Sequence, residues 1–288
     1  MDEVQGRFYS AQERYITALG HFFLNILNLD SFYSTVVKSL DAAKPQTQME
    51  CRDGMQQALS SPQGKRIIEK HPFGQDPEFF IQMAMGMANR SVRTARQTVD
   101  SAALVFAHTI LDGVLSECVH ISSLVNPVRW GAFVECRKVE FRELRRKSIE
   151  MLEREAVEAY VAQLDREPMT RRLELLNRVS VPLLKGQPIP TAWIKPDVMR
   201  AFDRLRQRIV HGQPSLKRRV VVGDEIYFAK TAGISILGLL GDAHGLWDGN
   251  SFKPKSARMS LRLLAIARRE FPEFLEVMED AVKRAEKR

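Results

Sequence analysis

The fold of this chain is decided by residues 98–125, TVDSAALVFAHTILDGVLSECVHISSLV. Five of these residues recur at steps of three or four: Leu104, His108, Leu111, Leu115 and Cys118. That spacing is typical of the buried face of an α-helix. Asn126 and Pro127 follow directly and predict where the helix ends, because a residue before proline avoids helical backbone angles. We therefore expect a long buried helix over this stretch.

Helical periodicity also dominates the rest of the chain, and no run of alternating strands separated by turn signals occurs. Further helices are expected over residues 8–43, 133–165, 170–180, 197–211, 224–247 and 256–288, the last with a bend at Pro272. Turn-rich stretches at 60–64 and 71–77 and a proline-rich connector at 181–193 lie between them. The methionines of residues 79–88 are expected to pack in a helix, and Gly233 and Gly238 to permit close approach of a neighbour. The sequence thus predicts an all-α protein.

Composition places the chain among ordinary globular proteins. It has 288 residues, of which 44% are hydrophobic and 27% are charged. Its three cysteines, Cys51, Cys118 and Cys136, are isolated and form no metal-binding or redox spacing. No signal peptide is recognisable, and the longest apolar stretch, residues 234–240, is far shorter than the ~20 residues that a membrane span needs. We expect a cytoplasmic protein with no membrane partner.

Positive charge is concentrated in one segment. The formal net charge is +8 and the isoelectric point is about 9.5. Residues 195–219 hold eight basic and two acidic side chains, whereas residues 1–97 hold eleven and ten. A concentrated positive field of this kind favours an anionic partner such as nucleic acid.

Within that segment, RQRIVHGQP at residues 206–214 ends an amphipathic helix. Its apolar face is formed by residues at steps of three and four: Val198, Phe202, Leu205 and Ile209. Four basic side chains fall on the opposite side, within a sector about 80° wide: Arg200, Arg204, Arg208 and His211. Arg206 lies about 140° from His211, at the edge of the apolar face. Glycine, histidine and proline suit a helix end, but clustered guanidinium groups also match phosphate oxygens.

These residues resemble the R-x4-6-H motif of HEPN domains: Arg206, Gln207, Ile209, Val210, His211 and Gly212. The family usually has asparagine, aspartate or histidine after the arginine, so Gln207 departs from the pattern. Arg204 also satisfies the motif at its longest spacing, although Leu205 follows it where a polar residue is expected. The resemblance leaves open which of the two arginines is the functional one.

The resemblance implies an antiparallel helical bundle with helical extensions at both ends. Helices 98–125, 133–165, 197–211 and 224–247 would take the four core positions. The expected organisation is an N-terminal extension over 1–97, a HEPN-like core over 98–250 and a C-terminal extension over 251–288.

The resemblance also implies a function, that of a metal-independent endoribonuclease which cleaves RNA through its 2′-hydroxyl, in a toxin–antitoxin or antiviral defence system. His211 would act as acid and base, with Arg206, Gln207 and Arg204 beside it. The RNA-binding residues would be Arg200, Arg208, Lys217, Arg218 and Arg219. No metal or cofactor is expected, and the expected partners are RNA, a second copy in a homodimer, and an antitoxin or regulatory protein.

Other interpretations stay open. The basic helix end is also compatible with a helical module that binds nucleic acid or a protein without cutting it. His244 lies near Asp242 and Asp248, but a metal site there lacks further ligands at suitable spacing. His108 and Asp112, one helical turn apart, are expected to form a hydrogen bond. His120 has no evident partner in the sequence.

Overall fold

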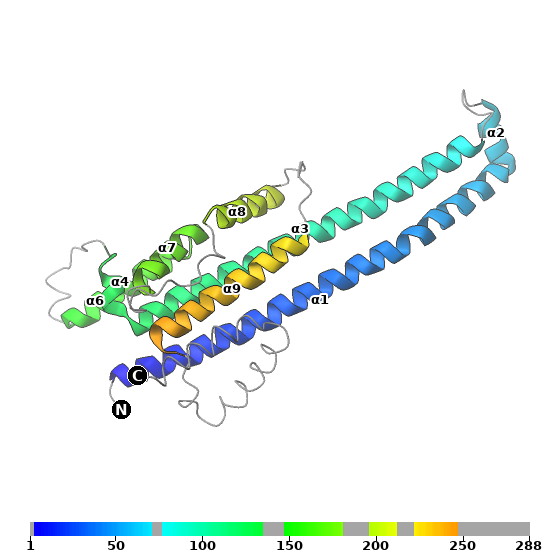
Figure 1. Cartoon of the computed structure of the whole chain (residues 1–288). Coiled ribbons are helices and arrows are strands. Elements are labelled where there is room, and N and C mark those ends of the chain that lie inside the picture. The colour runs from blue at the N-terminus through cyan, green and yellow to red at the C-terminus, as the bar shows by residue number, and fades with distance from the viewer. Residues whose placement is uncertain (1–2, 71–76, 135–146, 181–195, 212–221, 247–288) are drawn as a thin grey trace. The chain divides into compact units, whose positions relative to one another are not determined.

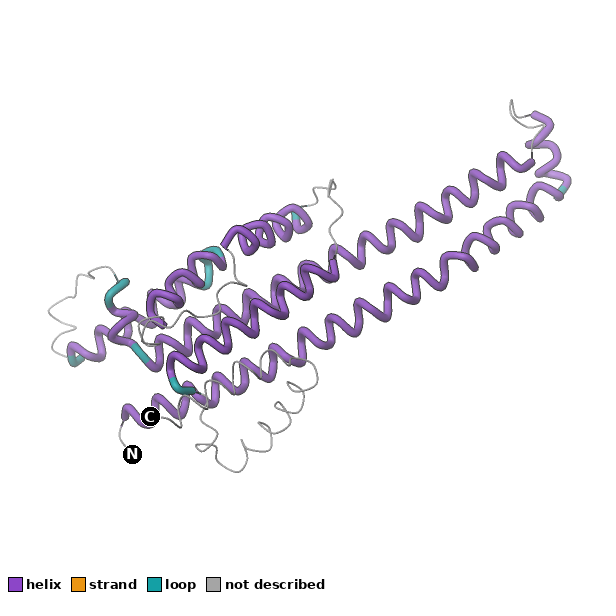
Figure 2. The backbone as a smooth tube through the Cα atoms, in the orientation of Figure 1, coloured by secondary structure: helices purple, strands orange, loops and turns teal. Residues whose placement is uncertain are grey.

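The computed structural model of the chain describes residues 3–70, 77–134, 147–180, 196–211 and 222–246. Every regular element in these ranges is an α-helix, and none is a strand (Figure 2). The predicted all-α fold is confirmed. The helices expected over 256–288 and the connector expected over 181–193 lie outside the described residues.

The chain divides into two compact units. Unit 1 takes residues 1–26 and 106–288, and unit 2 takes residues 27–105. Helices α1 (Glu3–Ser60) and α3 (Pro77–Val125) each contribute residues to both units. Residues 97 and 98, where the sequence suggested a domain boundary, lie inside the continuous α3.

Unit 2 is a hairpin of two long antiparallel helical arms, one from α1 and one from α3, with α2 (Pro62–Lys70) between them in the chain (Figure 1). The sheltered positions of the first arm recur at helical steps: Tyr33, Val36, Leu40, Thr47, Cys51, Met55 and Leu59. On the second arm, the buried positions include two alanines, Ala84 and Ala88. Such small side chains allow two helices to pack at short distance. The hairpin therefore closes along one narrow seam.

A polar group crosses this seam. The hydroxyl of Tyr33 donates a hydrogen bond of 2.8 Å to Asp100, and Arg96 Nε donates one of 3.1 Å to the same carboxylate. The guanidinium of Arg96 also lies 3.6 Å from Asp41 and 5.9 Å from the centre of the Tyr33 ring. Burial, and then the hydrogen bond to Asp100, raise the pKa of Tyr33. Arg96 is thus fully occupied by neighbours within the hairpin.

Both long helices exceed what the sequence predicted. The expected helix end near residue 43 is wrong, because α1 continues through Pro45 to Ser60. Pro45 is exposed and removes only one backbone donor, while the sheltered stripe continues on the other side of the helix. Likewise α3 begins at Pro77, so the methionine-rich segment and residues 98–125 form one helix. Its predicted end is confirmed, since α3 stops at Val125.

The helix expected over 133–165 is shorter than predicted. A single turn, α4 (Pro127–Gly131), follows α3, and the next described helix is α6 (Ile149–Leu164). The backbone N–H of Met151 donates to Ser148 Oγ at 3.2 Å, which satisfies one of the free donors at the start of α6. The predicted start at Phe133 is therefore wrong, and the N-terminal cap at Ser148 was the missed signal.

The core of unit 1 joins the start of α1, the second half of α3 and α9 (Val222–His244). A Cβ atom on Gly233 would collide with the ring of Phe22, and one on Gly241 would collide with the hydroxyl end of Tyr15. The Tyr15 hydroxyl donates to the carbonyl of Leu237 at 2.9 Å. The predicted close approach at Gly233 is confirmed.

A row of polar side chains on α3 meets the remaining helices of unit 1, including α7 (Met169–Ser180) and α8 (Pro196–Val210). We call it the α3 polar row, and its members recur every four residues: His108, Asp112, Ser116 and His120. His108 binds Asp203 of α8, and Asp112 binds Arg172 of α7. The predicted hydrogen bond between His108 and Asp112 is therefore wrong, because each faces a different helix.

By length and composition, α3 is also the one helix among the described residues that could cross a membrane. In its apolar window of 18 residues, half are buried inside the protein. The core helix of a soluble protein passes the same test, and Leu111 and Leu115 are fully buried in unit 1. Core packing thus accounts for much of the apolar character of α3.

Candidate nucleic-acid interface

Helix α8 carries the residues that the sequence singled out. Met199 and Phe202 are buried on its inner side, while Arg204, Gln207 and Arg208 are exposed. This arrangement agrees with the predicted amphipathic pattern. Leu205 and Ile209 are only partly buried, so the apolar anchor lies in the first half of the helix.

Two residues fix how α8 lies against its neighbours. The ring of Phe202 sits 5.4 Å from the His108 ring of α3 and 5.7 Å from the Phe228 ring of α9. Its contact with Phe228 is edge-to-face, the geometry that aromatic pairs favour. Next to it, Asp203 Oδ1 lies 2.7 Å from His108 Nε2. Together these contacts set the rotation of α8 and therefore which residues face solvent.

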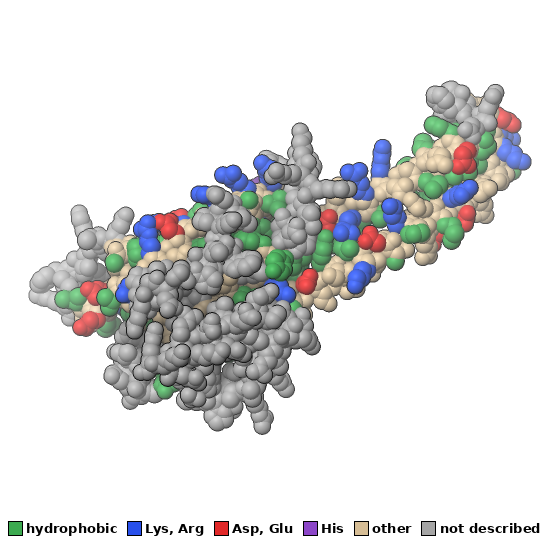
Figure 3. Space-filling view, in the orientation of Figure 1, with side chains coloured by type: hydrophobic (Ala, Val, Ile, Leu, Met, Phe, Trp, Pro, Cys, Tyr) green, Lys and Arg blue, Asp and Glu red, His purple; other side chains and the backbone are tan. Residues whose placement is uncertain are grey.

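The solvent-facing side of α8 is basic. Arg204, Arg208 and His211 are exposed and follow one another at steps of four and three residues, which places them on one face of the helix. In the view of Figure 3, lysine and arginine side chains gather in the region of α8. We call Arg204, Arg208 and His211, together with Arg206 at the edge of the apolar side, the α8 basic face.

The arginines of this face have no acidic partner among the described residues. Within the described part of the chain, no carboxylate lies within 4.0 Å of the guanidinium groups of Arg204, Arg206 or Arg208. Several arginines elsewhere pair with acids on their own helices, as Arg154 does with Glu158 at 3.0 Å. Unpaired guanidinium groups keep their donors available for phosphate oxygens.

Arg206 differs from its two neighbours. It is partly buried, as its predicted place at the edge of the apolar face requires, and its Nε atom is buried without a hydrogen-bond partner. Leaving a buried donor unpaired costs about 1 to 3 kcal/mol. Arg206 therefore keeps a guanidinium donor that no described group binds.

His211 follows directly after the last helical residue, Val210, and is exposed. Its backbone N–H donates to the carbonyl of Gln207 at 3.0 Å, and its ring Nε2 lies 3.1 Å from Gln207 Oε1. An amide oxygen only accepts hydrogen bonds, so in this arrangement Nε2 carries the proton. The neutral ring then presents Nδ1 as a proton acceptor.

The structure thus brings four of the predicted site residues to the end of one helix: Arg204, Arg206, Gln207 and His211. Arg200 and Arg208 lie on the same helix and are also exposed. The predicted RNA-binding residues Lys217, Arg218 and Arg219 lie outside the described residues, as does Gly212.

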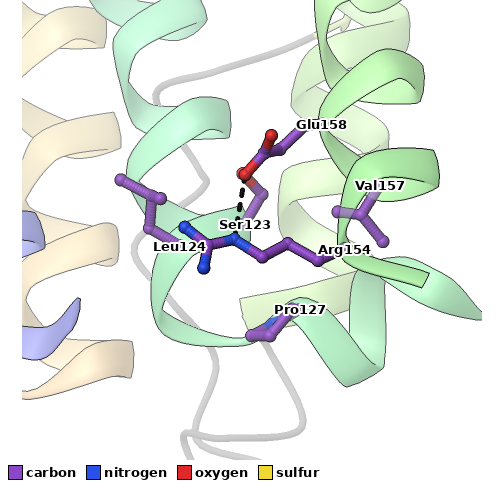
Figure 4. Close-up of a pocket in the computed structure, with 6 residues that line it drawn as sticks. All are labelled: Ser123, Leu124, Pro127, Arg154, Val157 and Glu158. Atoms are coloured by element: carbon purple, nitrogen blue, oxygen red, sulfur yellow. Dashed lines mark hydrogen bonds and ion pairs between the residues drawn. The ribbon is translucent and has the colours of Figure 1, made fainter. Parts of the chain in front are cut away.

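Two hollows formed by described residues hold none of the predicted site residues. A cavity of about 20 Å³ is lined by residues of α3, α4 and α6, and two of its α6 residues, Arg154 and Glu158, are joined by a hydrogen bond (Figure 4). It has room for about one water molecule. A larger hollow of about 510 Å³ lies beside α6, near Tyr160, Gln163 and Arg171, and no histidine lines it. Among the described residues, no three or more metal-ligating side chains gather in a way that could hold an ion.

Two other histidines of unit 1, His244 and His120, serve packing or pairing. His244 is buried, and its Nε2 lies 3.1 Å from Ser122 Oγ, which in turn accepts a 3.0 Å hydrogen bond from Trp130. Burial, helped by the charge of Arg129, lowers the pKa of His244 to about 4. A neutral buried imidazole is therefore part of the core, while Asp248 lies outside the described residues.

His120 has a partner that the sequence analysis missed. Its Nε2 lies 3.2 Å from Asp165, which also accepts a hydrogen bond from Ser116. Burial alone would raise the pKa of Asp165, but the hydrogen bonds from Ser116 and His120 outweigh it, so the pKa is lowered. The signal was present in the four-residue spacing of the α3 polar row.

Comparisons of the chain with protein-family models, with curated proteins and with solved structures find no match. The resemblance to HEPN domains therefore rests on the motif residues of the sequence alone.

Proposed function

We propose that this protein is a metal-independent endoribonuclease of the HEPN type, with its active site on the α8 basic face. The observation that supports this most is that an exposed His211, held by the Gln207 amide, follows a helix whose last two turns carry three arginines with no acidic partner among the described residues. A packing helix of the same composition would be expected to neutralise its arginines, as several other helices of this chain do. An RNA phosphate would supply the missing negative charge.

In the proposed reaction, the 2′-hydroxyl of a ribose attacks the adjacent phosphorus. His211 Nδ1 takes the hydroxyl proton, and a protonated histidine returns a proton to the departing 5′-oxygen. The products are a 2′,3′-cyclic phosphate and a 5′-hydroxyl, so no water, metal or redox partner enters the step. Two copies of His211 in a homodimer would divide the acid and base roles.

The arginines have a separate part. Negative charge builds on the non-bridging phosphate oxygens in the transition state, and a positioned guanidinium stabilises it. Arg206, the partly buried arginine of the motif, is assigned this task, with help from Arg204. Arg200 and Arg208 would bind neighbouring phosphates. Such contacts position the strand whatever its base sequence, because every nucleotide carries a phosphate. Lys217, Arg218 and Arg219, which follow in the sequence, would add positive charge for the same RNA.

The second candidate is a helical module that binds nucleic acid without cutting it. The three unpaired arginines favour binding in either case, because they would serve it without His211. The two candidates differ in the role of the His211 imidazole, which transfers protons in the nuclease and has no catalytic part in the binding module.

The test incubates the purified protein with labelled RNA in the presence of EDTA. We expect the parent to cut and His211→Ala to bind RNA but leave it intact. His21→Ala is the matched control, because His21 is an exposed histidine of α1 outside the proposed site. This variant should cut RNA like the parent. If no RNA is cut, or if His211→Ala cuts as fast as the parent, the enzyme is excluded; unchanged binding would then favour the module.

A further inference from the structure

Asp203 is the one acidic residue of α8 whose side chain the structure describes, and it lies three residues before Arg206. Carboxylates and guanidinium groups at that spacing are neighbours on a helix surface and attract each other. Elsewhere in this chain such pairs form, as between Arg171 and Glu174, three residues apart, at 3.2 Å. Asp203 and Arg206 nevertheless remain apart.

The reason is that Asp203 is already held from another helix. His108 of α3 lies 2.7 Å from its Oδ1 atom, and the His108 side chain is only 9% exposed. The His108 ring is itself fixed against Phe202, the neighbour of Asp203 in the chain, at 5.4 Å. The imidazole is therefore well placed to keep the carboxylate on the inner side of α8.

We infer that His108 is a positioning residue for the α8 basic face: by binding Asp203, it prevents this carboxylate from neutralising Arg206. This inference rests on the proposed function only in assigning RNA phosphate as the anion that Arg206 receives. Without His108, Asp203 would turn to an arginine three residues away, which is Arg206 on one side and Arg200 on the other.

The first variant is His108→Phe, which keeps an aromatic ring against Phe202 and removes the hydrogen bond to Asp203. We expect the loss of about one phosphate contact, which reduces the salt slope of RNA binding by about 0.7 and the affinity at 0.1 M salt roughly fivefold. Adding Asp203→Asn in the same chain should restore both, because the asparagine carries no charge to neutralise Arg206. His108→Gln, which still offers a donor to Asp203, should bind RNA like the parent.

A merely structural role for His108 gives a different result. In that case His108→Phe weakens binding only as far as it unfolds the protein, and Asp203→Asn fails to restore it. Thermal unfolding of each variant separates the two explanations. Failure of the rescue overturns the inference.

A second readout does not depend on RNA binding. In protein labelled with ¹⁵N-arginine, the guanidinium signals of Arg206 should shift in His108→Phe and return in the double variant, while those of Arg208, five residues from Asp203, stay in place. In the parent, inorganic phosphate should move the Arg206 signals and leave those of Arg172, which is paired with Asp112, unchanged. If the Arg206 signals shift neither with the substitution nor with phosphate, the inference is overturned. If they respond but the parent binds no RNA, the inference stands and the proposed function fails.

Discussion

Arg96 in the hairpin of unit 2 and Arg206 in α8 are both partly buried, and each has an aspartate within four residues on its own helix. Arg96 binds its aspartate, Asp100, together with Tyr33 and Asp41. Arg206 binds no acid, because its aspartate is held by His108. Arginine thus joins the two helices of the hairpin in unit 2, whereas in α8 it keeps donors available for a ligand. The difference separates an arginine that supports the fold from one that we assign to a ligand.

The largest expected effect concerns RNA cleavage. Arg206→Met should lower kcat/KM roughly 100-fold or more, because a donor aimed at developing charge is lost. Arg96→Met should leave the rate unchanged, since Arg96 is occupied within the hairpin. Initial rates on labelled RNA check both variants. Equal losses in the two would remove the distinction between these arginines.

The histidines give a parallel contrast, in which His244 is buried in the core and His211 is exposed. In the unfolded chain His244 gains a proton near its ordinary pKa of 6.5, but in the folded protein only near 4. Its contribution to stability is therefore complete above pH 6.5 and falls as the pH drops to about 4, by at most about 3 kcal/mol. Urea unfolding from pH 7 to 4 measures it.

His244→Gln is the control for that experiment, because its amide oxygen can still accept from Ser122. The stability difference between parent and variant should shrink as the pH falls from 6.5 to 4. A difference that stays constant with pH would contradict the assignment of a neutral, buried His244.

A smaller effect is expected on RNA affinity. Substituting Arg204 and Arg208 together by glutamine should reduce the salt slope of RNA binding by about 1.4, the equivalent of two contacts with a single strand. Arg90 and Arg93, two exposed arginines of the hairpin, provide the matched double variant, which should bind like the parent. Titrations at several salt concentrations distinguish them. Equal slopes for both double variants would show that the basic face is not the interface.

The smallest effect is on stability. Arg96→Met should lower the free energy of unfolding by about 1 kcal/mol, since Arg96 is partly exposed and solvent screens its pairs. Arg206→Met should cost less or even stabilise, because it removes a buried donor that has no partner. Chemical unfolding measures the loss of unfolding free energy in both variants. A larger loss for Arg206→Met than for Arg96→Met would contradict the assignment of Arg206 to a ligand rather than to the fold.

The sequence predicted correctly the features that depend on a single helix. The period of residues 98–125 and of α8 predicted their buried faces and ends, because amphipathic spacing depends only on the helix concerned. It failed near residues 43 and 98, where helix ends were expected but α1 and α3 continue along the hairpin. Pro45 faces solvent, so a single missing donor does not stop α1.

The candidate site shows the same limit. Arg204, Arg206, Gln207 and His211 were found from their spacing, since all four belong to one helix. The partners of the α3 polar row were not, because Asp203, Arg172 and Asp165 come from other helices whose packing no single-helix period encodes. Four polar residues at steps of four within an apolar helix indicate that something must pair with them, but not what.

The central claim is that His211 moves the proton of a ribose 2′-hydroxyl on the α8 basic face. The most direct measurement uses a DNA oligonucleotide with one ribonucleotide in its sequence, incubated with the protein in EDTA. We predict a single cut on the 3′ side of that ribose, leaving a 2′,3′-cyclic phosphate, and no cut with His211→Ala. Cleavage of the all-DNA strand, or a parent protein that leaves the ribonucleotide bond intact while binding the strand, would contradict the account.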